Sequence, residues 1–322
     1  MSVLVYAESS EGKFKKIALE AVSYGKKVAD QLGTNLSVLA INAHDVSILS
    51  DYGAEKIIKV TNDKLNNFNV KAYADVLKQG AEKENAETII IDSSNNGLYL
   101  APLLAVSLHA GYASNVVEAP SSTSPFTVKR KAFSNKAFNN TIIKTDKKII
   151  GLAKNSFGLV ENKVSATEEA FSPTLDDNDF NITSTAIDKA KGQITIADAD
   201  IVVSGGRGLK GPENWGMIEE LADILGAATA CSKPVSDLGW RPHSEHVGQT
   251  GKPVASNLYI AIGISGAIQH LAGINSSKVK VVINTDPEAP FFKAADYGIV
   301  GDAFEVVPKL IEKLKEFKAQ NA

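Results

Sequence analysis

Short apolar runs alternate with helical patterns along the first half of the chain. Strand-like runs occupy residues 3–7, 36–41, 57–60 and 88–92. Between them, apolar side chains recur three or four positions apart over residues 14–28 and 71–85. This alternation is typical of a mostly parallel sheet whose strands are joined by crossover helices. The sequence therefore predicts an α/β domain in the first half of the chain.

The pattern changes from about Pro120. Short strand-like runs separated by Asn, Ser and Lys follow at residues 126–130, 141–144 and 148–152. Residues 161–190 are rich in Ser, Thr, Asp and Asn and lack a firm period, so we interpret them as a linker or a surface strand. We place the first domain at residues 1–188, and the Ser- and Asp-rich stretch before Ala190 is a candidate hinge.

The second half repeats the order strand, glycine-rich turn, helix. Apolar runs at residues 201–203, 257–262, 280–284 and 297–300 predict strands. Helical patterns follow at about residues 215–225 and 304–318. This order is the pattern of nucleotide-binding α/β domains. We therefore expect residues 189–322 to form a doubly wound, Rossmann-like domain.

Composition excludes several classes of function. The formal net charge is -3 without a block of like charges, which argues against nucleic acid or an anionic membrane surface as a partner. Cys231 is the single cysteine, and the five histidines lack metal-binding spacing, so neither a disulfide nor a metal site is expected. Because the first residues resemble no leader and the apolar stretches are short, we expect a cytoplasmic protein that is not membrane-embedded.

Glycine-rich loops are the candidate chemistry of the second half. They comprise Ser204–Gly208, Gly248–Gly251 and Gly263–Gly266, and the sequence contains no GxSxG, GxxxxGK[ST] or HExxH motif. Glycines let backbone N–H groups approach a phosphate near the positive end of a helix. Each loop alone is a weak signal, since Ser265 as a helix N-cap explains its loop about as well. Together they favour a dinucleotide with a pyrophosphate.

Residues 92–97, between a predicted strand and a predicted helix, allow two interpretations. They form either a ligand-binding loop at the carboxyl edge of the sheet or a helix cap built from Ser and Asn.

The glycine loops lie within motifs similar to those of electron-transfer flavoprotein alpha subunits. The similar segments are Val202–Lys210, Val247–Lys252, Tyr259–Gly273, Ile283–Asn284, Asp286–Pro290 and Ala295–Val300. Their order and spacing match over essentially all of residues 200–310. The first half resembles the family only loosely, mainly through Val3–Glu8. The resemblance implies FAD as the cofactor of the second domain.

The resemblance also implies which residues hold the parts of FAD. The pyrophosphate group comprises Arg207, Gly263, Ser265 and Gly266. The adenosine group comprises Asn284, Asp302 and Ala303. The ring group comprises Ser232, Gln249, Thr250 and His270, with the Thr250 hydroxyl at flavin N5 and His270 at the pyrimidine carbonyl. The expected cofactor-binding set also includes Lys233, Val247, Gly248, Gly251, Ala267, Ile268 and Gln269.

Two positions of this set bear on the charge of the flavin. One-electron reduction without a proton places negative charge on the N1–C2=O side, which a cationic or hydrogen-bond-donating His270 would stabilise. Without the resemblance, His270 is better interpreted as a helix residue with a local hydrogen bond. Lys233 stands where the family usually has arginine, and it keeps the charge but loses the planar fork. We expect FAD to bind with a potential or semiquinone yield that Lys233→Arg changes.

The function implied is that of an electron carrier, not an enzyme with its own substrate. Such a carrier accepts electrons from flavoprotein dehydrogenases, such as the acyl-CoA dehydrogenases of fatty acid beta-oxidation. It passes them to a membrane quinone oxidoreductase through an anionic flavin semiquinone. A beta subunit, carrying AMP or a second FAD, would complete a heterodimer. The alternative is a flavin- or NAD-dependent oxidoreductase with its own small-molecule substrate; a nucleotide-binding regulatory module in the first domain is disfavoured.

Overall fold

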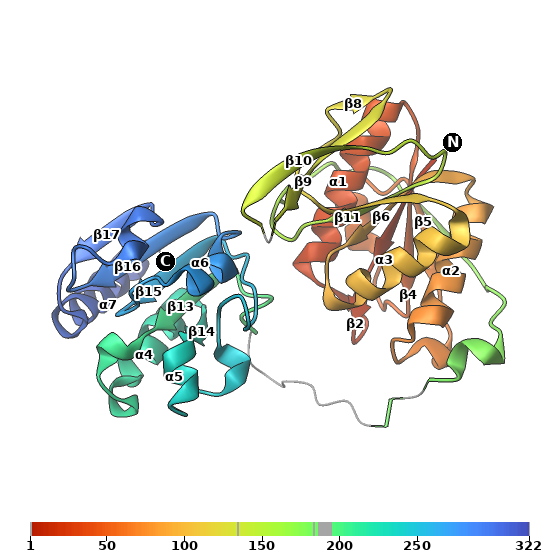
Figure 1. The fold of residues 1–322 in the computed structure, drawn as a ribbon. Helices are drawn as coiled ribbons and strands as arrows, with labels where there is room; N and C mark the ends of the chain where they lie inside the picture. Colours follow the sequence, from red (N-terminus) through yellow and green to blue (C-terminus); the bar gives the residue numbers. More distant parts are fainter. Residues whose placement is uncertain (1, 134, 183, 186–194, 322) are drawn as a thin grey trace. The chain divides into compact units, whose positions relative to one another are not determined.

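The computed structural model describes residues 2–133, 135–182, 184–185 and 195–321. The chain divides into two compact units (Figure 1), the first comprising Met1–Phe133 and Ala137–Ile187 and the second Ser134–Lys136 and Asp188–Ala322. Each unit has its own sheet and its own core. The expected boundary after residue 188, and residue 183 and residues 186–190 of the candidate hinge, lie outside the described residues.

The first unit is built on a mostly parallel sheet. Seven strands run parallel in the order β7-β11-β6-β1-β4-β5-β12, and β9 and β10 extend the sheet antiparallel beyond β7. The central strands β1 and β4 are almost wholly buried apolar runs, as expected of strands covered on both faces. The bounds are β1 (Ser2–Ala7), β4 (Leu36–Ile41), β5 (Lys56–Val60), β6 (Ala86–Asp92), β7 (Gly111–Val116), β9 (Phe126–Ala132), β10 (Ala137–Ile142), β11 (Lys148–Leu152) and β12 (Thr167–Ala170). Three short strands, β2 (Ser9–Ser10), β3 (Lys13–Phe14) and β8 (Ser122–Thr123), form minor pairs.

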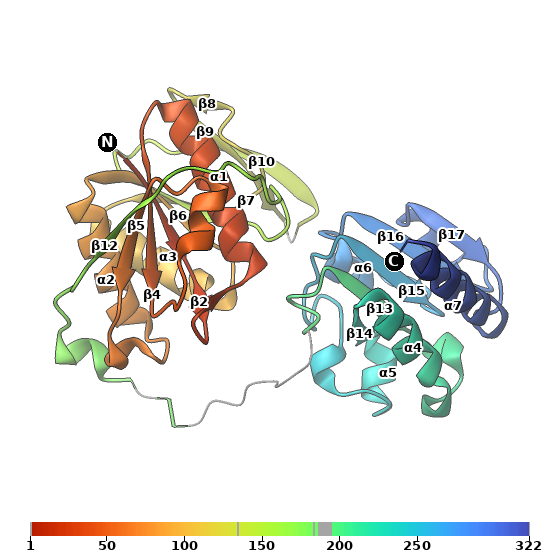
Figure 2. The same ribbon diagram turned by 180° about the vertical axis from the view of Figure 1, so that it is seen from behind.

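Three helices cover the two faces of this sheet. Helix α1 (Lys16–Leu32) packs in the core of one face, which is turned toward the viewer in Figure 2. Helices α2 (Val70–Lys83) and α3 (Asn95–Leu108) pack on the other face. Local chemistry sets their ends: the Asn69 side chain accepts hydrogen bonds from the first turn of α2, and Gly33 ends α1 at a φ of 62°.

The loop at residues 92–97 is a helix cap. The Ser94 hydroxyl accepts a hydrogen bond from the Gly97 backbone N–H at 3.1 Å, at the N-terminus of α3. The capping interpretation is therefore confirmed.

The second unit contains a five-stranded, fully parallel sheet in the order β14-β13-β15-β16-β17. Chain order along this sheet is 2-1-3-4-5, which is a doubly wound arrangement with its switch point between β13 and β15. Helices α4 and α7 pack with the core of one face, while α6 and η7 lie with the core of the other. The bounds are β13 (Ile201–Gly205), α4 (Gly216–Leu225), β14 (Ala228–Cys231), α5 (Lys233–Asp237), β15 (Leu258–Ile262), α6 (Ile268–Ile274), β16 (Val279–Asn284), β17 (Tyr297–Val300) and α7 (Ala303–Gln320). Short 3-10 turns are η1 (Ser47–Tyr52), η2 (Asp63–Leu65), η3 (Asp177–Phe180), η4 (Arg207–Leu209), η5 (Pro212–Asn214), η6 (His243–Glu245) and η7 (Pro290–Lys293).

The fold class predicted from the sequence is confirmed for both units. Within residues 161–190, β12 pairs with the edge strand β5, so the surface-strand interpretation holds for this described part. The short strands β2, β3 and β8 were not expected, and among the longer strands β7 and β14 were not. Strand β7 alternates polar and apolar residues only loosely, and β14 consists of small residues with weak strand preference.

Candidate functional site

Two glycine loops cross at the switch point of the second sheet. The Gly206 N–H donates to the Ile262 carbonyl at 2.8 Å, and the Gly208 N–H donates to the Gly263 carbonyl at 3.1 Å. A Cβ on Gly206 would lie 2.1 Å from the Gly263 carbonyl oxygen, and Gly263 itself has a φ of +64°. The crossing therefore requires glycine, and it opens a crevice at the carboxyl ends of β13 and β15.

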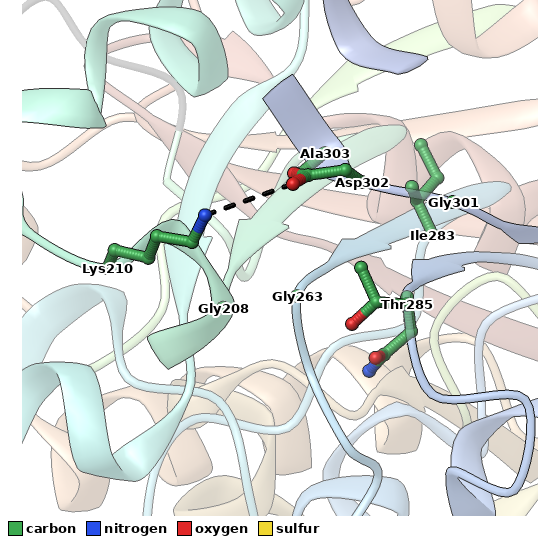
Figure 3. Close-up of a pocket in the computed structure, with 9 residues that line it drawn as sticks. Gly208, Lys210, Gly263, Ile283, Thr285, Gly301, Asp302 and Ala303 are labelled. Carbon is green, nitrogen blue, oxygen red and sulfur yellow. Dashed lines mark ion pairs between the residues drawn. The ribbon is translucent and has the colours of Figure 1, made fainter. Parts of the chain in front are cut away.

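A pocket of about 340 Å³ adjoins this crossing (Figure 3). The Lys210 ammonium lies 3.8 Å from an Asp302 carboxylate oxygen, and Asp302 also caps α7 by accepting from the Phe304 N–H at 3.0 Å. The volume lies at the small end of ligand pockets, so it suits one end of a dinucleotide. The pocket is lined by Gly208, Lys210, Gly263, Ile283, Asn284, Thr285, Gly301, Asp302 and Ala303.

Asn284 ties two loops together beside this pocket. Its side-chain N–H donates to the Ile264 carbonyl at 3.0 Å, and its side-chain oxygen accepts from the Asp286 N–H at 3.0 Å. The side chain thus fixes the glycine turn after β15 relative to the end of β16. A ligand contact by Asn284 would use its remaining N–H or lone pair.

The loop after β15 carries free backbone donors. In the part of the chain that the structure describes, the N–H groups of Ser265, Gly266 and Ala267 donate to no protein acceptor. Gly266 has a φ of +85°, and a Cβ there would lie 2.5 Å from the Phe291 backbone nitrogen. The Phe291 N–H in turn donates to the Ser265 carbonyl at 3.0 Å. The loop is therefore held rigid with its amides unpaired, which suits an anion.

Two further loops join the same edge. The Ser232 N–H donates to the Gly205 carbonyl at 3.1 Å, which places Ser232 beside the end of β13. The Val247 N–H donates to the Cys231 carbonyl at 3.0 Å, and the Gln249 N–H donates to the Gln269 carbonyl at 2.8 Å. These bonds hold the third glycine loop against the start of α6.

Cations lie along this edge with their charges exposed. Arg207 begins η4 and is exposed. Lys233 lies at the start of α5, with its ammonium 3.3 Å from an Asp237 carboxylate oxygen and its side chain 59% exposed. An exposed pair of this kind contributes little to stability and leaves the lysine able to turn toward a ligand.

His270 is buried and neutral. Its Nε2 lies 2.9 Å from the Tyr259 hydroxyl, and burial, reinforced by His246, lowers the pKa of His270 to about 4. This environment disfavours the cationic form at neutral pH, and a neutral hydrogen-bond-donating form is compatible with it.

Cys231 is a packed residue. Its side chain is fully buried, and burial, with a further contribution from Glu245, raises the pKa of the thiol to about 12. The expectation that it is not a nucleophile is consistent with this environment.

The fold brings the expected residues to one edge of the second sheet. They lie after β13, after β14, in the loop before β15, after β15, at the end of β16 and after β17. Sequence reasoning did not assign Gly208, Lys210, Ile283, Thr285 or Gly301 to the site, although the first two lie in the motif that begins at Val202. The helix α6 begins at Ile268 rather than near Ser265, so the loop amides themselves form the cradle.

The geometry fits a dinucleotide with a pyrophosphate. The switch point combines glycines that are packed too closely for a Cβ, backbone N–H groups without a protein acceptor among the described residues, and exposed cations. It lies next to a pocket of nucleoside size. Residues 195–275 match the family model described as the electron transfer flavoprotein FAD-binding domain, and residues 3–200 match the electron transfer flavoprotein domain. The chain belongs to the electron transfer flavoprotein alpha-subunit family. Its second domain is the FAD-binding domain of that family, and FAD is its cofactor.

Curated relatives match along almost the whole chain. The electron transfer flavoprotein subunit alpha of Bacillus subtilis is 36% identical over 325 residues, covering 98% of this chain and 97% of the relative. That of Thermoanaerobacterium thermosaccharolyticum is 36% identical over 329 residues, covering 98% of both. A probable mitochondrial electron transfer flavoprotein subunit alpha of Caenorhabditis elegans is 36% identical and covers 97% of this chain and 93% of the relative.

The helices and the metal-ligating side chains of the described ranges bear on two other kinds of site. Every helix there is too short or too polar to span a bilayer. Acidic, histidine and cysteine side chains do not gather there in a group of three that could hold a metal ion.

Proposed function

We propose that this chain is the FAD-carrying subunit of a heterodimeric electron carrier. It accepts electrons from flavoprotein dehydrogenases, such as acyl-CoA dehydrogenases, and passes them to a quinone oxidoreductase through the anionic flavin semiquinone. Membership of the alpha-subunit family supports this proposal, as do the free amides and glycine crossing at the switch point, which carry it structurally. The partner is a beta subunit that carries AMP or a second FAD.

Different groups of residues bind different parts of FAD in this proposal. Arg207 and Ser265, with the amides around Gly266, hold the pyrophosphate. Asn284, Asp302 and Ala303, which line one pocket, hold the adenosine end. The ring group and neighbouring cofactor contacts comprise Ser232, Lys233, Val247, Gly248, Gln249, Thr250, Gly251, Ala267, Ile268, Gln269 and His270. When bound, FAD supplies reversible one- and two-electron chemistry.

A carrier is favoured over an enzyme by the state of the buried titratable groups. His270 and His246 both have a lowered pKa, for which burial is the first cause, and Cys231 has a pKa of about 12. At neutral pH neither histidine is in the imidazolium form that donates a proton, and the thiol is not in its nucleophilic thiolate form. The alternative, a flavin- or NAD-dependent oxidoreductase with its own substrate, would need such a group elsewhere on the edge.

The two domains have different roles in this proposal. The first, residues 1–188, contacts the beta subunit, and the second, residues 189–322, carries FAD and moves between partners. The protein works in the cytoplasm, between its dehydrogenases and a membrane-bound acceptor.

Electron delivery tests the proposal. The chain is purified with its beta subunit, loaded with FAD and mixed anaerobically with either an acyl-CoA dehydrogenase plus substrate or NADH alone. Bleaching of the flavin absorption by the dehydrogenase, without turnover of NADH alone, is expected. Steady turnover of NADH or another small molecule by the isolated complex would favour the oxidoreductase alternative.

A further inference from the structure

A buried polar cluster lies beneath the proposed flavin edge. Its centre is Tyr259 on β15, which is fully buried and whose hydroxyl lies 2.9 Å from Nε2 of His270 on α6. The buried Ser204 hydroxyl on β13 is a neighbour of the Tyr259 hydroxyl, and it has no hydrogen-bond partner among the described residues. The cluster thus links two strands of the sheet to the helix that follows the glycine loop.

The chemistry of the contact between Tyr259 and His270 fixes the direction of the central hydrogen bond. Burial first, and His246 second, lower the pKa of His270 to about 4, so the imidazole carries one proton at neutral pH. Nδ1 is buried and has no hydrogen-bond partner among the described residues, so Nε2 makes the one contact that decides the direction. A phenol O–H that donates to an unprotonated imidazole nitrogen pairs the more acidic donor with the more basic acceptor, so the ring proton lies on Nδ1. Nε2 is then the acceptor, and the Tyr259 hydroxyl is the donor.

The same cluster supports the cradle for the pyrophosphate. The Tyr259 and Phe291 rings lie nearly parallel, 8° apart with centroids separated by 6.5 Å, and the His270 ring lies 6.0 Å from each. Phe291 is fully buried and its N–H holds the Ser265 carbonyl. Displacement of the imidazole would therefore disturb Phe291 and, through it, the loop at Ser265.

We propose that Tyr259 is a positioning residue for the flavin edge, because its hydroxyl donates to Nε2 of His270 and holds this histidine as the Nδ1–H tautomer. The consequence for FAD rests on the proposed function, whereas the tautomer does not. In this arrangement His270 stays neutral, and the positive charge near the flavin comes from Lys233. The proposed role of Tyr259 involves no covalent chemistry, and neither Tyr259 nor His270 transfers electrons.

The tautomer is tested first on the unaltered full chain. Long-range ¹⁵N–¹H correlation spectra resolve the imidazole nitrogens of the five histidines, and the His270→Gln variant identifies the signals of His270. At pH 7.5, with or without added FAD, we expect a protonated Nδ1 and an unprotonated Nε2 with the shift of a hydrogen-bond acceptor. A protonated Nε2 with an unprotonated Nδ1, or a doubly protonated ring, would overturn the proposal.

The effect on the flavin edge is tested with Tyr259→Phe. Loss of one buried donor is expected to convert His270 to a mixture of tautomers and to raise the FAD dissociation constant about tenfold. Tyr24→Phe is the matched control, since Tyr24 is also fully buried but its hydroxyl donates to the Glu118 carbonyl, at 3.2 Å, in the first unit. The control should change neither the tautomer of His270 nor the FAD dissociation constant.

The outcomes separate the two proposals. An unchanged His270 spectrum in Tyr259→Phe contradicts the positioning role, and so does a changed spectrum with wild-type FAD affinity. Failure of the unaltered chain to bind FAD, with His270 in the expected tautomer, would instead contradict the proposed function and leave the hydrogen-bond direction supported.

Discussion

At the scale of single residues, the position of Gly263 decides whether two loops can cross. Its φ of +64° lies in the left-handed region, and a Cβ there would lie 2.8 Å from the Gly208 Cα. Gly226, the C-cap of α4, has nearly the same φ of +62° but no atom within 4 Å of such a Cβ. The two glycines therefore separate backbone strain from steric overlap.

Gly263→Ala should abolish FAD binding and lower the free energy of unfolding of the second domain by about 2–4 kcal/mol. Gly226→Ala should cost about 1 kcal/mol, because only the backbone strain is added, and should leave FAD affinity unchanged. Urea unfolding and FAD titration measure both variants. Equal losses in both would show that the crossing at Gly263 plays no special part.

A second residue-scale prediction concerns acid. The pKa of His270 in the folded state, about 4, lies below its ordinary value of 6.5, so the unfolded chain binds more protons between these values. Stability from the neutral histidine is full above pH 6.5 and is lost as the pH falls toward 4. His270→Gln should reduce the loss of second-domain stability over this window by about 2–3 kcal/mol. Parallel pH profiles of the two chains would contradict it.

At the scale of elements, the junction of β6 and α3 combines a helix cap that stabilises α3 with a buried carboxylate that destabilises the fold when it is ionised. Ser94 caps α3 and its hydroxyl donates to Glu8 at 2.6 Å, while one oxygen of the buried Asp92 meets no partner in the described chain. Burial first, and Glu8 second, raise the pKa of Asp92 to about 6. The junction is therefore destabilised by ionisation of Asp92.

Asp92→Asn should stabilise the first domain by about 1–3 kcal/mol at pH 7.5, because it removes a buried charge. The folded pKa lies above the unfolded one, so the protonated carboxyl is favoured at low pH and its contribution disappears as the pH rises through 6. The gain should accordingly vanish near pH 3.5. Unfolding of both chains at the two pH values measures it, and a gain of equal size at both would exclude ionisation as its cause.

The elements also show what periodicity can and cannot predict. Strands with continuous apolar runs, such as β4 and β17, lie where the sequence places them. The strand β14 was missed because Ala228–Cys231 has small side chains, and the neighbours that recruit it, β13 and η6, are distant in sequence or irregular.

The candidate site could likewise be predicted only in part from the sequence. Loop glycines and the polar residues beside them could be assigned from motifs, because their spacing is local. The neutrality of His270 could not be predicted, since it depends on burial and on His246, which lies in a loop elsewhere in the chain.

At the scale of the whole molecule, two cores in two units predict two separable unfolding events. The carboxylate of Glu20 on α1 accepts hydrogen bonds from the backbone N–H groups of Asn155, Phe157 and Gly158, each at 2.8 Å. It thereby holds the chain after β11 against the first core.

Glu20→Gln should lower the free energy of unfolding of the first domain by about 2–4 kcal/mol, because a charged acceptor of three amides is lost. FAD affinity and the unfolding of the second domain should not change. Calorimetry of the full chain with and without FAD measures both transitions. A matching loss in the FAD-stabilised transition would mean that the two domains unfold as one.

The central claim is that the second domain holds one FAD at the carboxyl edge of its sheet. The most direct measurement is a titration of FAD into the full chain purified with its beta subunit, followed by flavin absorption and fluorescence. The account predicts saturation at one FAD per alpha chain in the wild type and its loss in Gly263→Ala, while Gly226→Ala binds normally. A wild-type chain that takes up no FAD, or a Gly263→Ala chain that binds it as tightly as the wild type, would contradict the account.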